Sequence, residues 1–93
     1  MRSRYSAFVL KLEPYLLATW HPDTRPATLD IATDTTQWLG LEVKRHVVET
    51  ETSATVEFIA RYKVNGRAHR LHEISRFRRI ENQWLYLDGT FQE

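Results

Sequence analysis

One acidic residue in the second half of the chain is expected to lie inside the protein. Glu73 belongs to a run with the alternation typical of a strand, and the face that it shares with Leu71 and Phe77 is apolar. An ionised carboxylate in such surroundings is costly unless it is paired or hydrogen-bonded. A buried carboxyl group without a cationic partner is suited to act as a general acid or base. Glu73 is therefore the first candidate functional residue.

Three other side chains could assist Glu73 in catalysis. Tyr86 could donate a hydrogen bond to an oxyanion, as tyrosines do in enolising enzymes. Asp88 is expected beside Glu73 on the same face, and His21 could approach from the end of a second helix. These four candidates support one hypothesis, in which the chain is a small isomerase or lyase and Glu73 is its acid or base.

A structural role for Glu73 is the simpler alternative. Arg2 and Arg4 lie on the first expected helix and could reach over a sheet edge. Either one would neutralise Glu73 as a buried ion pair. Such pairs perturb titratable groups as catalytic sites do, so the sequence leaves both roles open.

Metal and nucleic-acid sites find little support in the sequence. The chain has no cysteine, and His69 and His72 are spaced to lie on opposite faces of a strand. We therefore expect no metal and no cofactor. Basic residues are concentrated between positions 61 and 79, but most aromatic side chains are expected to point inward. Binding of single-stranded nucleic acid needs exposed rings for stacking, which argues against it here.

Two short helices are expected at the start of the chain. Apolar residues at helical spacing mark the first, namely Tyr5, Phe8, Val9 and Leu12. Ser3 is a candidate N-cap. Pro14 ends this helix and can open the second, which runs to Trp20 and stops before Pro22. Positions 23–37 are predicted to form a loop with one helical turn.

Strands are predicted after Trp38. A first strand of roughly ten residues alternates Leu39, Leu41, Val43 and Val47 with mostly polar residues. A second places on one face Val56, Phe58, Ala60, Tyr62 and Val64. Asn65-Gly66 is a strong signal for a tight hairpin, because both central residues of such a turn need positive φ.

These turns predict a register for the sheet. The first pairs Val64 with Arg67, Tyr62 with His69, Ala60 with Leu71, Phe58 with Glu73 and Val56 with Ser75. A second turn at Glu81-Asn82 pairs Arg79 with Trp84, Phe77 with Tyr86 and Ser75 with Asp88. A bulge would reverse every assignment beyond it.

Together these elements predict one α+β domain over residues 1–93, with helices on one face of a curved antiparallel sheet. The side chains expected to line its interior are Tyr5, Tyr15, Trp20, Phe58, Leu71, Glu73, Ser75, Phe77 and Tyr86. No apolar run reaches the ~20 residues of a membrane span, and the first residues lack a secretory signal. We expect a cytoplasmic protein. A core this small favours a homodimer.

Several segments resemble the middle domain of the YchJ family of uncharacterised bacterial proteins. They are RSRYSAF at 2–8, YLLATWHP at 15–22, WLGLEV at 38–43, EF at 57–58, RLHE at 70–73 with Ser75 and Phe77, and WLYLDG at 84–89. The resemblance covers nearly the whole chain. It implies a nuclear transport factor 2-like (NTF2-like, cystatin-like) fold, a cone of bent sheet closed by helices.

The same resemblance limits what carries over to this chain. Family members usually add a cysteine-rich SEC-C zinc motif before this domain and often another after it. This chain has no cysteine, so zinc and partners recruited through that motif do not carry over. It is either a short member or an isolated domain.

Two functional hypotheses follow. The first is a module that binds a small ligand or a protein partner, as a homodimer. The alternative is the isomerase or lyase that uses Glu73. An unfilled cavity reaching Glu73 would separate the two, because a solid interior would leave only an interaction module.

Overall fold

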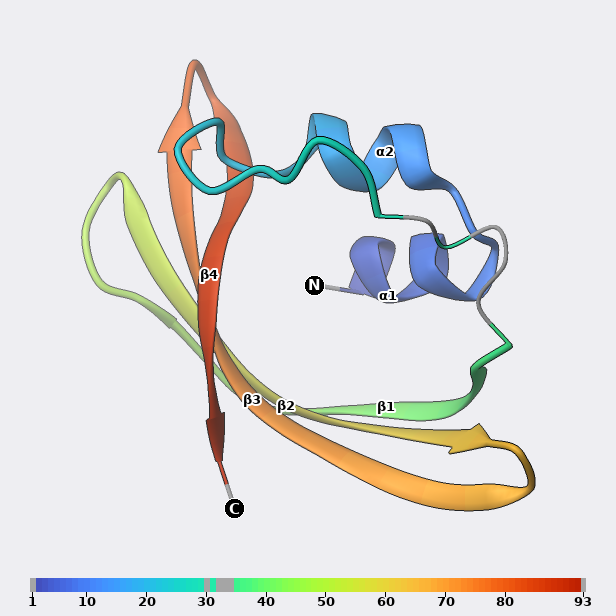
Figure 1. Ribbon diagram of the computed structural model, residues 1–93. Helices are drawn as coiled ribbons and strands as arrows, with labels where there is room; N and C mark the ends of the chain where they lie inside the picture. Colours follow the sequence, from blue (N-terminus) through green and yellow to red (C-terminus); the bar gives the residue numbers. More distant parts are fainter. Residues whose placement is uncertain (1, 30, 32–34, 93) are drawn as a thin grey trace.

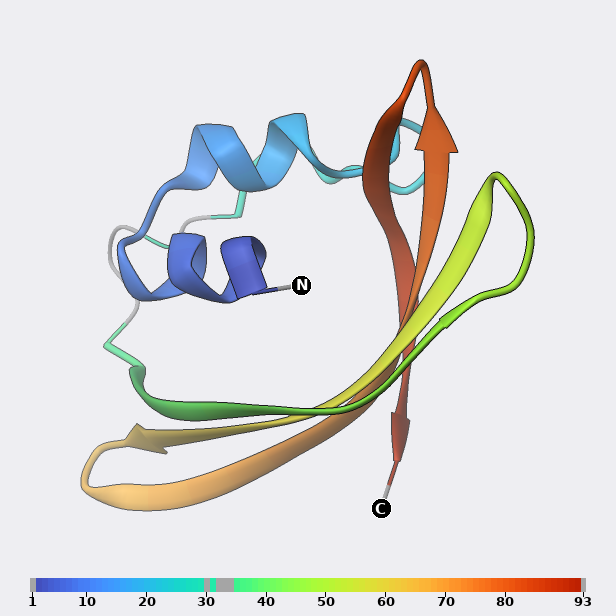
Figure 2. The same ribbon diagram turned by 180° about the vertical axis from the view of Figure 1, so that it is seen from behind.

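The computed structural model describes residues 2–29, 31 and 35–92. Two helices precede four strands, and the elements are α1 (Arg2–Val9), α2 (Glu13–Ala18), β1 (Gln37–Val48), β2 (Ser53–Val64), β3 (Arg67–Ile80) and β4 (Gln83–Gln92). The strands form one sheet in the order β1-β2-β3-β4, and every neighbouring pair is antiparallel. The sheet bends around the two helices, which lie on its concave side (Figures 1 and 2). The predicted α+β architecture is confirmed.

The first helix differs from the sequence prediction in where it begins and in which of its side chains are buried. Pro14 lies in the first turn of α2, as predicted, but α1 begins at Arg2, so Ser3 is inside the helix and not its N-cap. Val9 is 45% exposed, whereas Arg4 and Ala7 are buried. Arg4 finds polar partners inside the protein, so its face of the helix turns inward and the predicted apolar stripe is only partly buried.

The central hairpin has the predicted register. All five predicted pairs between β2 and β3 are present, including Phe58 with Glu73. Asn65 and Gly66 have φ values of 51° and 79°, the left-handed conformation that this tight turn requires. The inward face of β2 supplies a core cluster made of Val56, Phe58 and Ala60 together with Phe77 of β3.

The first strand departs from simple alternation. Its pairing with β2 shifts between Trp38 and Gly40 and again between Val43 and Arg45. Trp38 packs against the core cluster, and Leu39 is 54% exposed. The prediction that Leu39 shares a face with Leu41 and Val43 is wrong, because the irregularity reverses the side-chain direction before Leu41.

A third irregularity changes the pairing of β3 with β4. Phe77 pairs with Tyr86 as predicted, but the register shifts between Arg76 and Phe77. Ser75 consequently faces Gly89, and Asp88 pairs with Arg76. The predicted pairing of Ser75 with Asp88 is therefore wrong.

Asp88 belongs to the outer face of the sheet. Arg76 Nε donates to its Oδ1 at 2.6 Å, and Arg76 Nη2 donates to Oδ2, so the pair is bidentate. The Arg76 hydrogen bond, with its charge, holds the pKa of Asp88 below its ordinary value. Asp88 cannot assist Glu73 from that face.

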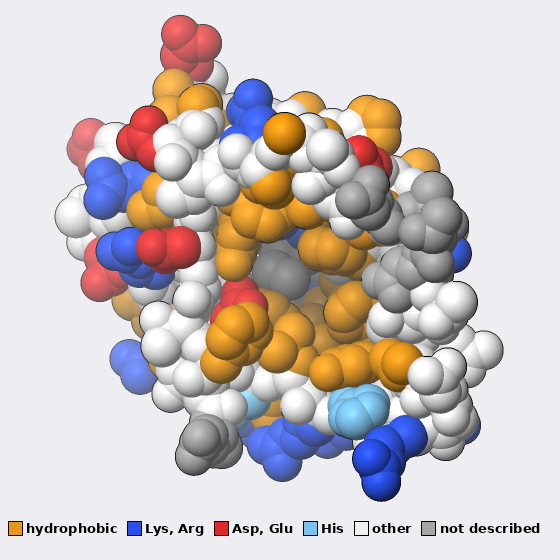
Figure 3. All heavy atoms as spheres, viewed as in Figure 1, with side chains coloured by type: hydrophobic (Ala, Val, Ile, Leu, Met, Phe, Trp, Pro, Cys, Tyr) orange, Lys and Arg blue, Asp and Glu red, His pale blue; other side chains and the backbone are white. Residues whose placement is uncertain are grey.

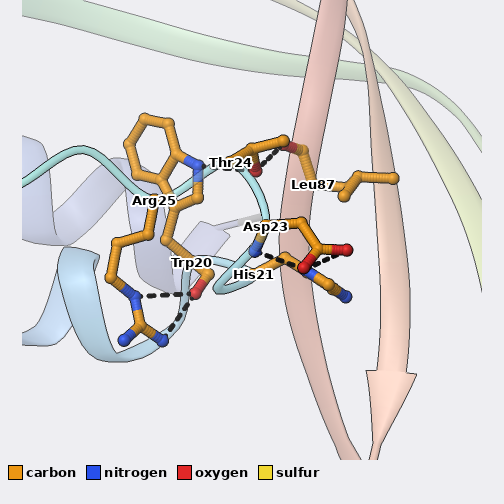
Figure 4. Close-up of polar contacts among 6 residues, drawn as sticks. All are labelled: Trp20, His21, Asp23, Thr24, Arg25 and Leu87. Carbon is orange, nitrogen blue, oxygen red and sulfur yellow. Dashed lines mark hydrogen bonds and ion pairs between the residues drawn. The ribbon is translucent and has the colours of Figure 1, made fainter.

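The segment after α2 is fixed to the edge strand β4. The Tyr86 N–H donates to the Thr19 carbonyl at 2.8 Å, and the His21 N–H donates to the Tyr86 carbonyl at 2.7 Å. The Thr24 hydroxyl donates to the Leu87 carbonyl, and Trp20 Nε1 donates to Thr24 Oγ1 at 3.2 Å (Figure 4). These bonds hold the Trp20 ring against Tyr86, with ring centroids 4.9 Å apart.

Across the described residues, no helix is long and apolar enough to cross a membrane. In the loop predicted at positions 23–37, Ile31 has a 3₁₀ conformation, and the predicted helical turn would need the residues on either side of it. Its neighbours at positions 30 and 32–34 lie outside the described residues. Ile31 packs with Ala7 and Leu16 in a second core cluster under the helices.

The contact between Gly89 and Glu73 yields a stability prediction. A Cβ atom at position 89 would lie 2.5 Å from Glu73 Cδ and 2.9 Å from Cγ, so Gly89→Ala must displace the carboxylate. We expect it to lower the free energy of unfolding by about 1–3 kcal/mol, as overpacking does. Urea unfolding monitored by tryptophan fluorescence measures this change.

Gly40→Ala is the matched control. A Cβ atom at position 40 would have no heavy atom within 4 Å. Its free energy of unfolding should change by no more than about 0.5 kcal/mol, as for other open positions. Equal effects of the two substitutions would contradict the close packing of Glu73 on Gly89.

Candidate ligand-binding cavity

An inner cavity of about 120 Å³ lies between the helices and the concave face of the sheet. Its lining residues are Arg4, Tyr5, Phe8, Trp20, Trp38, Phe58, Ala60, Leu71, Glu73, Ser75 and Tyr86. Most of these side chains are apolar or aromatic, and the space-filling view shows a hollow with orange walls on this side of the molecule (Figure 3). The interior is therefore not solid, and the cavity reaches Glu73.

Glu73 is buried, with 7% of its surface exposed. Ser75 Oγ donates a hydrogen bond to Glu73 Oε2, and the Tyr86 hydroxyl lies 3.4 Å from the same oxygen. Oε1 accepts no hydrogen bond from the described residues. Glu73 also lines the inner cavity, so a buried carboxylate held at Oε2 forms part of the cavity wall.

Arg4 is the second charged group of the cavity, and 4% of its surface is exposed. Its Nη1 donates to the Leu16 carbonyl at 3.1 Å and to Thr19 Oγ1 at 2.6 Å. The guanidinium carbon lies 5.2 Å from the Trp20 ring centroid and 4.8 Å from that of Tyr86. Such cation–π contacts partly replace the water that a buried cation loses.

The predicted ion pair between Glu73 and Arg2 or Arg4 is not formed. No arginine or lysine nitrogen of the described residues lies within 4.0 Å of the Glu73 carboxylate. Arg4 is drawn instead to the carbonyl of Leu16 and to two aromatic rings. The Tyr86 side chain contacts both charges, since its ring lies beside Arg4 and its hydroxyl near Glu73.

Burial and charge shift the titration of these groups. Burial raises the pKa of Tyr86 to about 12, and the negative charge of Glu73 adds to this shift. Burial lowers the pKa of Arg4, against the opposing effect of nearby Tyr86, Tyr15 and Glu73. An arginine stays protonated at neutral pH despite such a shift. At neutral pH Tyr86 is therefore a hydrogen-bond donor, and Arg4 is a cation.

The structure brings together most of the residues that the sequence placed inside. Seven of the nine expected interior residues line the inner cavity: Tyr5, Trp20, Phe58, Leu71, Glu73, Ser75 and Tyr86. Tyr15 and Phe77 line a separate, larger hollow on another side of Arg4. Two of the four catalytic candidates, Glu73 and Tyr86, thus share the cavity.

His21 and Asp88 lie elsewhere. The Asp23 N–H donates to His21 Nδ1 at 3.0 Å, and the Asp23 carboxylate lies 3.8 Å from the same nitrogen (Figure 4). His21 thus accepts a hydrogen bond within the loop after α2 and does not line the cavity. Within the described ranges, no three histidine or acidic side chains are grouped so that they could hold a metal ion.

Sequence reasoning missed four cavity residues, namely Arg4, Phe8, Trp38 and Ala60. Arg4 and Phe8 are four residues apart on α1, so they share a face, and this spacing could have found them. Ala60 belongs to the predicted inward face of β2, so the alternation of that strand could have found it. Only the irregular pairing of β1 turns Trp38 inward, and no sequence signal marks it.

Comparison with known proteins places the chain in a family. The family model for "YchJ, middle NTF2-like domain" matches residues 1–89. The UPF0225 protein RSc0270 of Ralstonia nicotianae is 55% identical over 96% of this chain and 69% of its own length. A UPF0225 protein of Methylibium petroleiphilum is 57% identical over 96% of this chain and 65% of its own length.

Two solved structures share the fold. The SEC-C motif containing protein RPA3114 from Rhodopseudomonas palustris superposes with a TM-score of 0.87 at 32% identity, over 100% of this chain and 76% of that chain. A SEC-C motif containing protein from Psychrobacter arcticus gives 0.80 at 36% identity, over 100% and 59%. The chain thus spans about two thirds of the length of its relatives. It belongs to the uncharacterised bacterial YchJ (UPF0225) family, as a middle NTF2-like domain.

Proposed function

We propose that this domain binds a small ligand in the inner cavity of a cone-shaped NTF2-like fold, with Glu73 as the recognition group. The observation that carries the proposal is the buried Glu73 carboxylate in the wall of the inner cavity, with no arginine or lysine nitrogen of the described residues within 4.0 Å of it. The cavity volume of about 120 Å³ is close to that of an engineered apolar cavity of about 150 Å³ that admits benzene. A single ring with a short substituent is the size of ligand that fits.

The lining also specifies the polarity of the ligand. A carboxylate oxygen accepts hydrogen bonds, so the head of the ligand should be a donor, best an ammonium or amidinium group. The rings of Trp20, Trp38 and Phe58 form apolar walls for a flat body and favour a cation. Arg4 already occupies one face of Trp20 and of Tyr86, so the head group belongs at the Glu73 side.

Benzylamine is a suitable probe for this site. In a titration followed by backbone amide NMR, it should shift resonances of residues lining the cavity. Glu73→Gln should weaken binding by about tenfold or more, because a hydrogen bond to a charged group is lost. Benzyl alcohol has the same ring without the charge, so Glu73→Gln should weaken its binding less than that of benzylamine.

Asp88→Asn is the matched control, since it removes a carboxylate on the outer face of the same sheet. It should leave benzylamine affinity unchanged. Shifts that avoid the cavity, or equal affinities of the Glu73→Gln and parent proteins for benzylamine, would remove the proposed role of Glu73.

An acid–base enzyme is the second candidate, and one observation favours it. The Tyr86 hydroxyl, whose pKa is about 12, stays protonated at neutral pH and lies 3.4 Å from the Glu73 carboxylate. A base and a neutral donor on one cavity wall could remove a proton next to a carbonyl and stabilise the resulting enolate. Asp88 and His21 have no part in this version, because they lie outside the cavity.

Proton exchange tests this activity without knowledge of the substrate. Cyclopentanone in D₂O should exchange the hydrogens next to its carbonyl faster with the protein than in buffer alone, as followed by proton NMR. Glu73→Gln should abolish the excess rate, and Tyr86→Phe should reduce it by about 10²-fold, as loss of one oxyanion donor does. An exchange rate equal to that of buffer would leave only the binding function.

The titration of Tyr86 tests the electrostatics of the cavity. Its pKa is raised from 10.0 to about 12, so the folded state favours the neutral phenol. This contribution to stability is complete below pH 10 and is lost as pH rises toward 12. Ultraviolet absorbance of the phenolate should therefore show one late-titrating tyrosine, which Tyr86→Phe removes.

Glu73→Gln should lower the pKa of Tyr86, since it removes the negative charge that opposes ionisation of the phenol. The pKa should stay above 10.0, because burial is the larger cause of the shift. An unchanged midpoint in Glu73→Gln would contradict the contribution of the Glu73 carboxylate to the pKa of Tyr86.

A further inference from the structure

A larger hollow of about 370 Å³ lies on another side of Arg4 from the inner cavity. Both helices and all four strands contribute to its walls. Its volume falls in the range of about 300–1,000 Å³ that small-molecule sites occupy. Among the residues that the structure describes, Arg4 alone lines both hollows, so a ligand here would contact a different set of side chains from the one that Glu73 would hold.

The arginines around this hollow give it one sign of charge. Arg2 and Arg4 line it, and no acidic residue of the described part does. The imidazole of His46 is a further lining group. The hydroxyl groups of Ser3 and Thr19 add two neutral polar groups beside the arginines. The sheet contributes apolar side chains to the lining, among them Val43, Val56, Phe77 and Trp84, and His46 lies there as the cross-strand partner of Val56. Arginines from α1 together with apolar side chains from the sheet fit an anionic head on an apolar body.

Arg4 supplies the anchoring group. Its Nη1 is used by Leu16 and Thr19, and the described hydrogen bonds leave Nε and Nη2 without protein partners. Arg4 lines the hollow, although only 4% of its surface is exposed. The edge of a guanidinium group presents two N–H donors that match the two oxygens of a carboxylate.

We propose that the larger hollow is a second binding site, for a small monocarboxylate with an apolar body. The carboxylate accepts hydrogen bonds from Arg4, with Arg2 and His46 at the rim, and the body packs against Val56 and Phe77. A cation would meet like charge at Arg2 and Arg4. A phosphate dianion would lose more hydration than one buried guanidinium returns, so the monoanion fits best.

A calorimetric titration with 3-phenylpropanoate tests the proposal on the whole chain. The carboxylate should bind at least tenfold more tightly than 3-phenylpropanamide, which has the same shape without the charge. Arg4→Lys keeps the charge but loses the planar fork, and should weaken binding about tenfold. Because Arg4 also links α1 to the end of α2, the thermal unfolding midpoint of Arg4→Lys should be measured and should match that of the parent protein.

A second pair of variants makes the test independent of Arg4. Arg2 and His46 are exposed, so Arg2→Gln and His46→Gln should fold normally. The double variant should weaken carboxylate binding several-fold and reduce its dependence on salt. Arg61→Gln, which removes an exposed arginine of β2 that lines neither cavity, should leave affinity unchanged.

The outcomes separate this site from the inner cavity. Equal affinities for the acid and the amide, or no loss in both Arg4→Lys and the double variant, would overturn the carboxylate site. NMR shifts at Val43 and Val56 should accompany 3-phenylpropanoate, whereas benzylamine should shift residues beside Glu73. If both probes shifted the same resonances and displaced each other, they would share one site, and the proposal of a second site would be overturned.

Discussion

The burial of one arginine constrains the arrangement of the whole interior. Arg4 extends from α1 to the end of α2, where it bonds the Leu16 carbonyl and Thr19, and it stacks beside the Tyr86 ring of β4. A buried charge is tolerated only when such partners replace water. The guanidinium therefore sets which face of α1 turns inward, ties both helices to the sheet, and lies between the two hollows.

Tyr86 allows a cation and an anion to share this interior without direct contact. The Arg4 guanidinium lies 4.8 Å from the centroid of its ring, and its hydroxyl lies 3.4 Å from Glu73 Oε2. Glu73 in turn lies against Gly89, where no side chain competes for the space. Within the described residues, no ion pair links Glu73 and Arg4. Glu73 lines the inner cavity, and Arg4 lines both hollows.

The irregular strand pairings explain where prediction from sequence failed. The shift between Arg76 and Phe77 moves Asp88 to the outer face and brings Gly89 to the Glu73 side. Likewise the shift after Trp38 turns that ring inward and leaves Leu39 exposed. A bulge adds one residue to one strand only, and the alternation of apolar and polar residues does not reveal it.

The sequence by itself determined the α+β class, the Asn65-Gly66 hairpin, and the inward direction of Phe58 and Glu73. These follow from local rules, since a turn that requires positive φ fixes its register and alternation fixes the faces. Tertiary structure alone decided that Arg4 would be buried against aromatic rings instead of pairing with Glu73. The energy of a buried charge depends on every group around it, and for Arg4 those groups come from the segment 15–20, from β3 and from β4.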